Sequence, residues 1–188
     1  MHIERNAAAP AAPLQLHGEG LNLLRVLADG ESVSFREEAG ALIIDNPPAG
    51  ATFTLEIRNT IAPDKNTELS GLYTSGGGFY TQCEAEGFRR ISYFLDRPDV
   101  MAVFTVTIRA DRARYPVLLS NGNLVDAGEI AGDQHYAVWH DPFPKPSYLF
   151  ALVAAKLGVL EDAFVTRSGK RVQLAIYVEP GKLDQCPH

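Results

Sequence analysis

The chain has 188 residues, of which 46% are hydrophobic and 21% charged, and its formal net charge is −6. This composition supplies enough apolar surface for a core and argues against disorder, while the acidic balance disfavours nucleic acid, whose phosphates need clustered basic groups. No run of 18 apolar residues would span a membrane, and the two cysteines lie far apart in the sequence, so we expect a protein of the reducing cytoplasm without a disulfide framework.

The first half of the chain has the pattern of short strands separated by turns. Segments 21–27 and 32–35 flank Asp29-Gly30, and this arrangement predicts a hairpin because glycine tolerates positive φ angles. Segment 52–58 alternates between apolar and polar residues, which predicts a strand with one buried face. The residues expected on that face are Phe53, Leu55 and Ile57.

The second half continues in the same way. Segments 103–108 and 136–139 are rich in branched and aromatic residues, as strands are, and 115–120 leads into a tight turn at Asn121-Gly122. Segment 148–154 is continuously apolar, so we expect a strand buried on both faces. Segment 154–161 is the one stretch with some helical character.

A last hairpin is predicted from segments 163–167 and 171–178, which bracket Ser168-Gly169. The alternation in its second strand predicts an apolar face turned toward the core, formed by Val172, Leu174, Ile176 and Val178. Many short strands with frequent turns indicate an all-β fold, either an antiparallel sandwich or an open, curved sheet.

Five motifs, in a fixed order, resemble the aminopeptidase N family, the zinc-dependent alanyl aminopeptidases of bacteria. The resemblance runs from about Pro13 to the end of the chain. The motifs occupy 81–89 (TQCEAEGFR), 92–100 (SYFLDRPDV), 118–123 (LLSNGN), 141–154 (DPFPKPSYLFALVA) and 166–169 (TRSG).

The resemblance implies a particular domain of that family, its N-terminal β-domain, in which the sheets form a curved, saddle-like assembly. We therefore expect residues 1–188 to form a single β-domain that lacks the family's first strands, with 1–13 as a poorly ordered, Ala/Pro-rich lead-in. An incomplete sheet would leave an unpaired edge, so we also expect the isolated chain to self-associate.

The family's catalytic zinc domain is absent from this chain. A zinc aminopeptidase needs His-Glu-x-x-His on a helix, and none of the five histidines here is followed by Glu. The resemblance implies that zinc belongs to the missing catalytic domain of a parent enzyme, on which this domain would pack. We expect no catalytic residue and no metal ligand in the chain, and an isolated chain without activity.

Site residues are implied by the first motif. Carried over from the family, Glu84 binds the free α-ammonium of a peptide substrate, and Gln82 lines the pocket for its first side chain. A carboxylate suits this task because a charge-assisted hydrogen bond discriminates against a blocked terminus. For Glu86 we expect a structural role in an ion pair with Arg89 or Arg90. Cys83 is interpreted as a packed residue rather than a nucleophile.

Two other constellations have plain structural interpretations. His135 and His140 are five residues apart, so on a strand they would point to opposite faces and could not share a metal. The segment 96–99 (DRPD) predicts a turn closed by a carboxylate–guanidinium pair.

Two functional alternatives remain open from the sequence. One is a stand-alone β-sandwich that binds a sugar or a protein partner. The other is an interface domain without substrate contact, which a deeply buried Glu84 would favour.

Overall fold

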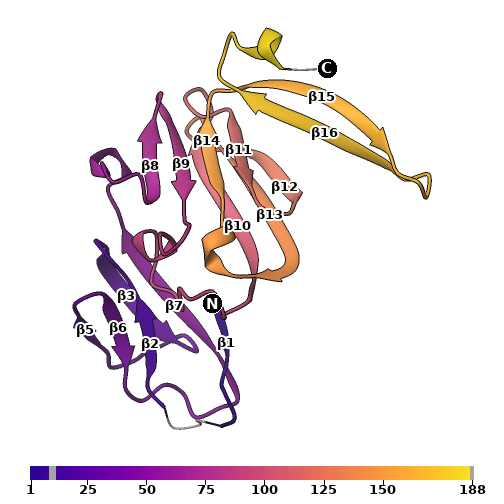
Figure 1. Ribbon diagram of the computed structural model, residues 1–188. Coiled ribbons are helices and arrows are strands. Elements are labelled where there is room, and N and C mark those ends of the chain that lie inside the picture. The colour runs from indigo at the N-terminus through magenta and orange to yellow at the C-terminus, as the bar shows by residue number, and fades with distance from the viewer. Residues whose placement is uncertain (9–11, 187–188) are drawn as a thin grey trace.

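The computed structural model describes residues 1–8 and 12–186 of the chain, and its regular structure is almost entirely β (Figure 1). The described part contains sixteen strands and four short 3-10 helices, and the strands form several antiparallel sheets. This arrangement confirms the all-β prediction. None of the described helices is long and apolar enough to cross a membrane.

Two small sheets enclose the first core. The strands of the first sheet are, in spatial order, β1 (His2–Glu4), β7 (Thr52–Thr60), β3 (Asn22–Ala28) and β4 (Glu31–Ser32). Those of the second are β2 (Leu14–His17), β6 (Ala41–Ile44) and β5 (Arg36–Glu38). Leu16, Leu42 and Leu55 are fully buried between them, which accounts for the apolar alternation of β7. The predicted hairpin at Asp29-Gly30 is confirmed, and both residues have positive φ angles.

The first residues of the chain belong to this sheet, so the expected poorly ordered lead-in is wrong for them. β1 pairs with β7, with His2 opposite Thr54, and the Met1 ammonium donates a hydrogen bond to the Leu55 carbonyl over 2.6 Å. The edge of β7 has backbone N–H and C=O groups with which an extended N-terminus can form hydrogen bonds. The Ala/Pro-rich run begins only after these residues. Residues 9–11 of the same expectation lie outside the described part of the chain.

A second group of strands follows. One sheet has the order β11 (Val117–Ser120), β14 (Leu152–Ala155), β9 (Gly78–Gln82) and β8 (Gly71–Ser75). The other has the order β10 (Ala102–Asp111), β13 (Gln134–Lys145) and β12 (Asn123–Ile130). Their shared core includes Ile108, Leu118 and Ala154. The Trp139 indole lies against it and donates to the Leu118 carbonyl over 3.0 Å.

The structure corrects two expectations between residues 147 and 161. The apolar run 148–154 is not one strand, because the 3-10 helix η3 (Ser147–Leu149) interrupts it and the amide of Phe150 bonds the Ser147 carbonyl. The strand β14 begins only at Leu152. The helical character expected over 154–161 is also wrong, since strand pairing at both ends overrides that weak local preference.

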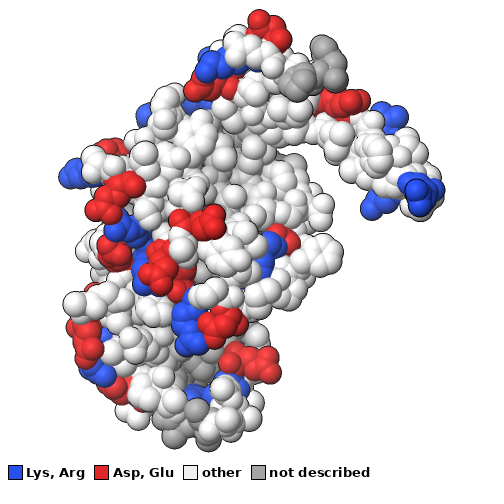
Figure 2. Space-filling model, viewed as in Figure 1, with Lys and Arg blue, Asp and Glu red and all other residues white. Residues whose placement is uncertain are grey.

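The last hairpin, formed by β15 (Gly158–Val165) and β16 (Arg171–Val178), extends away from the body of the molecule (Figures 1 and 2). Its register is regular along the whole length. The expectation that its apolar face turns toward the core is wrong within this chain, because Leu174 and Ile176 are 44% and 46% exposed. At the start of this face, Leu183 of η4 (Leu183–Gln185) lies beside Gly158.

Candidate functional site

The candidate site begins where β9 ends. Gln82 is the last residue of that strand, and a short loop connects it to the 3-10 helix η2 (Phe88–Arg90). Gln82 and Glu84 are both exposed, and the Gln82 amide donates a hydrogen bond of 3.4 Å to the Glu84 carbonyl oxygen. The peptide bond between Glu84 and Ala85 is cis. The structure therefore brings the two predicted site residues together on one exposed loop.

The loop is closed tightly behind these side chains by Gly87. Its amide donates to the Cys83 carbonyl over 2.8 Å. A Cβ atom at Gly87 would lie 2.4 Å from the Gln82 carbonyl oxygen and 2.9 Å from the Gly71 amide nitrogen. Backbone atoms approach too closely for any side chain, so only glycine fits at this position.

A buried carboxylate fixes the end of the loop. Asp96 is 2% exposed, and its Oδ2 accepts hydrogen bonds from the Arg89 amide (3.1 Å) and the Arg89 Nε (2.9 Å). Its Oδ1 accepts a bond of 2.5 Å from the Ser147 hydroxyl, and its backbone carbonyl accepts one from the Arg89 guanidinium. Both carboxylate oxygens are thus satisfied, which a buried charge requires. We call this set of bonds the Asp96 network.

Aromatic side chains pack beneath the same loop. Phe88 meets the rings of Phe94 and Phe150 edge-on, each at a centroid distance of 5.0 Å. Cys83 lies in this cluster and is 2% exposed. Burial, with a smaller contribution from the negative charge of Asp96, raises the pKa of its thiol to about 12. The thiol therefore stays protonated near neutral pH, which agrees with its interpretation as a packed residue.

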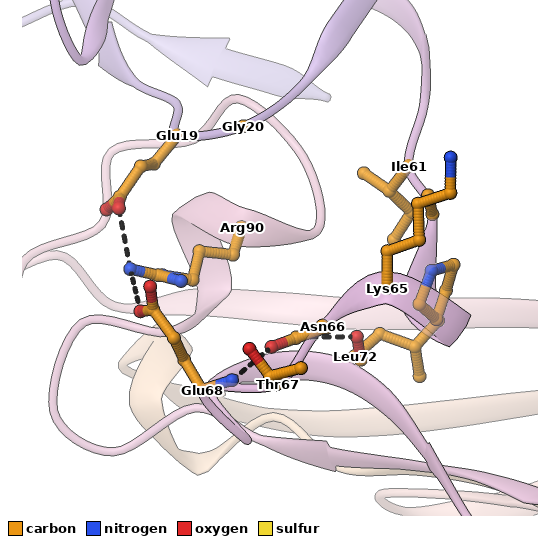
Figure 3. A pocket seen from close by; sticks show the side chains of 11 residues that line it. Glu19, Gly20, Ile61, Lys65, Asn66, Thr67, Glu68, Leu72 and Arg90 are labelled. Carbon is orange, nitrogen blue, oxygen red and sulfur yellow. Dashed lines mark hydrogen bonds and ion pairs between the residues drawn. The ribbon is translucent and has the colours of Figure 1, made fainter.

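The remaining charged residues of the loop have separate partners. Glu86 forms an ion pair of 3.3 Å with Arg89, one of the two partners expected for it. Arg90 turns away and binds Glu19 and Glu68, each at 2.6 Å, at the rim of a pocket of about 290 Å³ (Figure 3). Because both carboxylates already occupy this guanidinium, the pocket offers no free basic group from Arg90 to an anionic ligand.

Neither this pocket nor a larger groove of about 970 Å³ beside β1 and β10 is lined by Gln82 or Glu84. The two side chains instead project from an open surface. Among the described residues the candidate site is thus an exposed surface loop.

The two central histidines make polar contacts within the fold. His135 Nε2 lies 2.7 Å from the Tyr115 carbonyl oxygen, and His140 Nδ1 lies 2.9 Å from the Thr105 hydroxyl. Across the described residues, no group of three or more His, Cys, Asp or Glu side chains could hold a metal. The expected turn at 96–99 is also present, with Arg97 paired to Asp99.

The Asp96 network was not predicted from the sequence. The 96–99 pattern pointed to Arg97 and Asp99, whereas Asp96 turns inward to Arg89 and to Ser147, which is 51 residues away. The only indication of this network in the sequence was that Asp96 and Ser147 both lie within motifs of the family resemblance.

Replacing Asp96 tests the network. Asp96→Asn removes the buried charge and leaves the partly buried Arg89 guanidinium with only the exposed Glu86 as counter-ion, which should lower the free energy of unfolding by about 3 kcal/mol. The matched control is Asp99→Asn, whose carboxylate forms an exposed pair with Arg97 and should shift the urea midpoint little. Equal shifts for the two variants would show that the network does not hold the loop.

Thiol reactivity tests the burial of Cys83. The folded pKa lies above the ordinary value of 9.0, so this group's contribution to stability is complete below pH 9 and is lost as the pH rises toward about 12. In a Cys186→Ser background at pH 8, Cys83 should react with a disulfide reagent about 1,000-fold more slowly in the folded chain than in urea. Similar rates in the two states would contradict the assignment.

Comparison with known proteins supports the resemblance noted in the sequence. Residues 1–149 match the profile of the Peptidase M1 N-terminal domain. The chain is 55% identical over 180 residues to aminopeptidase N of Escherichia coli K12, and 48% identical over 187 residues to aminopeptidase N of Caulobacter vibrioides. These matches cover 95% and 98% of this chain, but it spans only about a fifth of the length of either relative.

Solved structures share the fold. Aminopeptidase A of Legionella pneumophila, crystallised with aspartic acid, superposes with a TM-score of 0.88 at 37% identity, over 93% of this chain and 21% of that one. An M1 zinc metallopeptidase of Deinococcus radiodurans gives 0.75 at 19% identity, over 90% and 40%, a likeness of fold alone. By sequence and by architecture, the chain belongs to the Peptidase M1 N-terminal domain family.

Proposed function

We propose that this chain acts as the N-terminal domain of a zinc aminopeptidase, called the parent enzyme below, which hydrolyses the N-terminal residue from peptides. The domain binds the free α-amino end of the substrate and closes one side of the active-site cleft. Supporting this are the family membership and the high identity to two proteins named aminopeptidase N.

The observation that carries the site is the exposure of Glu84 on a loop whose backbone is held from behind. Gly87 and the Asp96 network fix the loop, while no ion pair of the Glu84 carboxylate is found among the described residues. A positioned, solvent-facing carboxylate can bind an ammonium group without first breaking an internal contact. Gln82, which bonds the Glu84 carbonyl, would lie next to the first side chain of the substrate.

The exposure of Glu84 also weighs against the interface-domain alternative. That alternative requires the Glu84 carboxylate to lie deep in the core. Zinc would be held by the rest of the parent enzyme, because the described residues offer no ligand cluster. There it would supply the Lewis-acid chemistry of peptide hydrolysis. The part assigned to this chain is to bind and orient the substrate's ammonium group.

Substitution of Glu84 tests this role directly. Glu84→Ala in the parent enzyme removes a charged hydrogen-bond partner from the cleft and should lower kcat/KM for amino-acid arylamides by about 30- to 1,000-fold, or about 2–4 kcal/mol. The thermal midpoint should barely change, because an exposed loop carboxylate contributes little to the core.

The matched control is Glu86→Ala, two residues along the same loop. Glu86 forms only a partly exposed ion pair with Arg89, so its loss should reduce kcat/KM much less. Equal and small effects of the two substitutions would mean that Glu84 is an ordinary solvated side chain.

The isolated chain provides a second test. Because it contains no His-Glu-x-x-His sequence, the purified 188-residue chain should release no arylamine from amino-acid arylamides. Elemental analysis after dialysis should find no stoichiometric zinc. One tightly held zinc ion per chain would refute this assignment of the metal to the rest of the parent enzyme.

A further inference from the structure

A second segment of the chain runs beside the loop that carries the candidate site, residues 82–87, called the site loop below. The strands β9 and β14 are antiparallel neighbours (Figure 1). At the end of their ladder, the Leu152 amide donates a hydrogen bond of 2.8 Å to the hydroxyl of Thr81, one residue before the site loop. Because the strands run in opposite directions, the residues that precede Leu152, the flanking segment 147–151, continue alongside the site loop.

The flanking segment is also connected to the other end of the site loop. The Ser147 hydroxyl donates to Oδ1 of Asp96 over 2.5 Å, and Oδ2 of the same carboxylate accepts a bond of 3.1 Å from the Arg89 amide. Between the two ends, Phe150 packs with Cys83 in one buried aromatic cluster. The two segments are therefore held together at both ends and in the middle.

The exposed side chains of the two segments share one outer surface. Cys83 and Phe150 are buried and face each other, whereas the residues next to them in sequence, Glu84 and Leu149, are exposed. Leu149 is 49% exposed, although leucine is among the residues that are most often fully buried. An apolar side chain thus projects from the flanking segment on the same side as the Glu84 carboxylate projects from the site loop.

The backbone that carries Leu149 is fixed by a third segment. The Asn121 side-chain amide donates to the Leu149 carbonyl over 2.9 Å, and its Oδ1 accepts a bond of 2.6 Å from the Ala151 amide. The Ser120 hydroxyl donates to the Ala151 carbonyl over 2.7 Å. Backbone groups on both sides of Phe150 are thereby satisfied, as a neighbouring strand would satisfy them. A ligand that contacts Leu149 would therefore meet a surface whose backbone is already ordered.

We propose that Leu149 is a specificity-determining residue, which contacts the first side chain of the peptide substrate in the parent enzyme. The inference rests on the proposed function, because the Glu84 carboxylate would fix the position of the substrate's α-ammonium. The ammonium and the first side chain are attached to the same carbon atom, so that side chain must lie against the surface next to Glu84. Gln82 provides the polar part of this surface, and Leu149 provides the apolar part.

The chemistry of this surface defines the preferred substrate. A long aliphatic side chain, such as that of leucine, would remove apolar area of Leu149 from water, whereas the single methyl group of alanine would cover less of it. An acidic side chain would place another carboxylate beside the exposed carboxylates of Glu84 and Glu86. The contact should therefore favour peptides that begin with a large aliphatic residue, and alanine substrates serve as the reference.

Ratios of kcat/KM in the parent enzyme test the inference. Leu149→Ala should lower the ratio of leucine arylamide to alanine arylamide by about tenfold, because the apolar contact is lost. Leu149→Asp should raise the ratio of lysine arylamide to leucine arylamide by about tenfold, because a carboxylate then lies beside the first side chain, and added salt should weaken this effect. Both substrates are measured with the same enzyme, so any loss of folded protein cancels from the ratio.

Leu124 provides the matched control, since it is 52% exposed but belongs to β12, in the other sheet of the second group. Leu124→Ala and Leu124→Asp change the same kind of side chain away from the site loop and should leave both ratios unchanged. Unchanged ratios in the Leu149 variants, or equal changes in the Leu124 variants, would overturn the inference.

Thiol labelling gives a readout that does not depend on catalysis. Leu149→Cys in the parent enzyme should react with a thiol reagent above the background of the unsubstituted enzyme, and saturating L-leucine should slow this reaction by at least about tenfold. Leu124→Cys should react at the same rate with and without leucine. A cysteine at 149 that does not react would mean that other parts of the parent enzyme cover it, and one that leucine does not protect would place the first side chain elsewhere. Either outcome would contradict the role of Leu149.

The two proposals fail in different ways. Shifted ratios and leucine protection in an enzyme that is indifferent to Glu84→Ala would refute the role of Glu84 alone. Unshifted ratios in an enzyme that is sensitive to Glu84→Ala would refute the role of Leu149 alone.

Discussion

The buried carboxylate of Asp96 is the interaction on which the candidate site depends. It connects η2, the turn at 96–99 and η3, three segments that no sheet holds together. A charge at 2% exposure is tolerated because its oxygens accept bonds from a guanidinium, an amide and a hydroxyl. Removing the Ser147 hydroxyl would leave Oδ1 unsatisfied, and removing the Arg89 guanidinium would leave the buried charge without its cationic partner, so the three segments are restrained as a unit.

The side of the loop that faces the core is tightly packed, whereas the opposite side is exposed to solvent. Behind the loop, Gly87 allows backbone atoms to meet at distances that exclude a side chain, and Phe88 and Phe150 fill the space below. In front, Gln82 and Glu84 are exposed and take little part in the core. Stability and recognition therefore reside in different side chains, which permits variation of the exposed pair without loss of the fold.

The hairpin β15–β16 shows the opposite balance. Its strands pair along their full length, yet its apolar residues lack a second layer within the described chain. Hydrogen bonds alone stabilise a ribbon only slightly, since the same groups are well hydrated when unfolded. Within the described chain this hairpin thus gains less from apolar packing than the two central cores, which are closed by residues of their own sheets.

The sequence by itself determined many of the strands, several turns and the family, because alternation, glycine turns and ordered motifs are local signals. The hairpins at Asp29-Gly30 and Ser168-Gly169 are examples. The pairing of β1 with β7, the break at η3 and the Asp96 network were decided only by tertiary structure. The first and last of these join segments far apart in the chain, and a residue such as Ser147 gains its role only when packing brings Asp96 to it. The roles of Glu84 and Gln82 remain predictions. For the hairpin β15–β16, the alternating pattern correctly indicated an apolar face, but no local pattern could reveal that this face is exposed within the described chain.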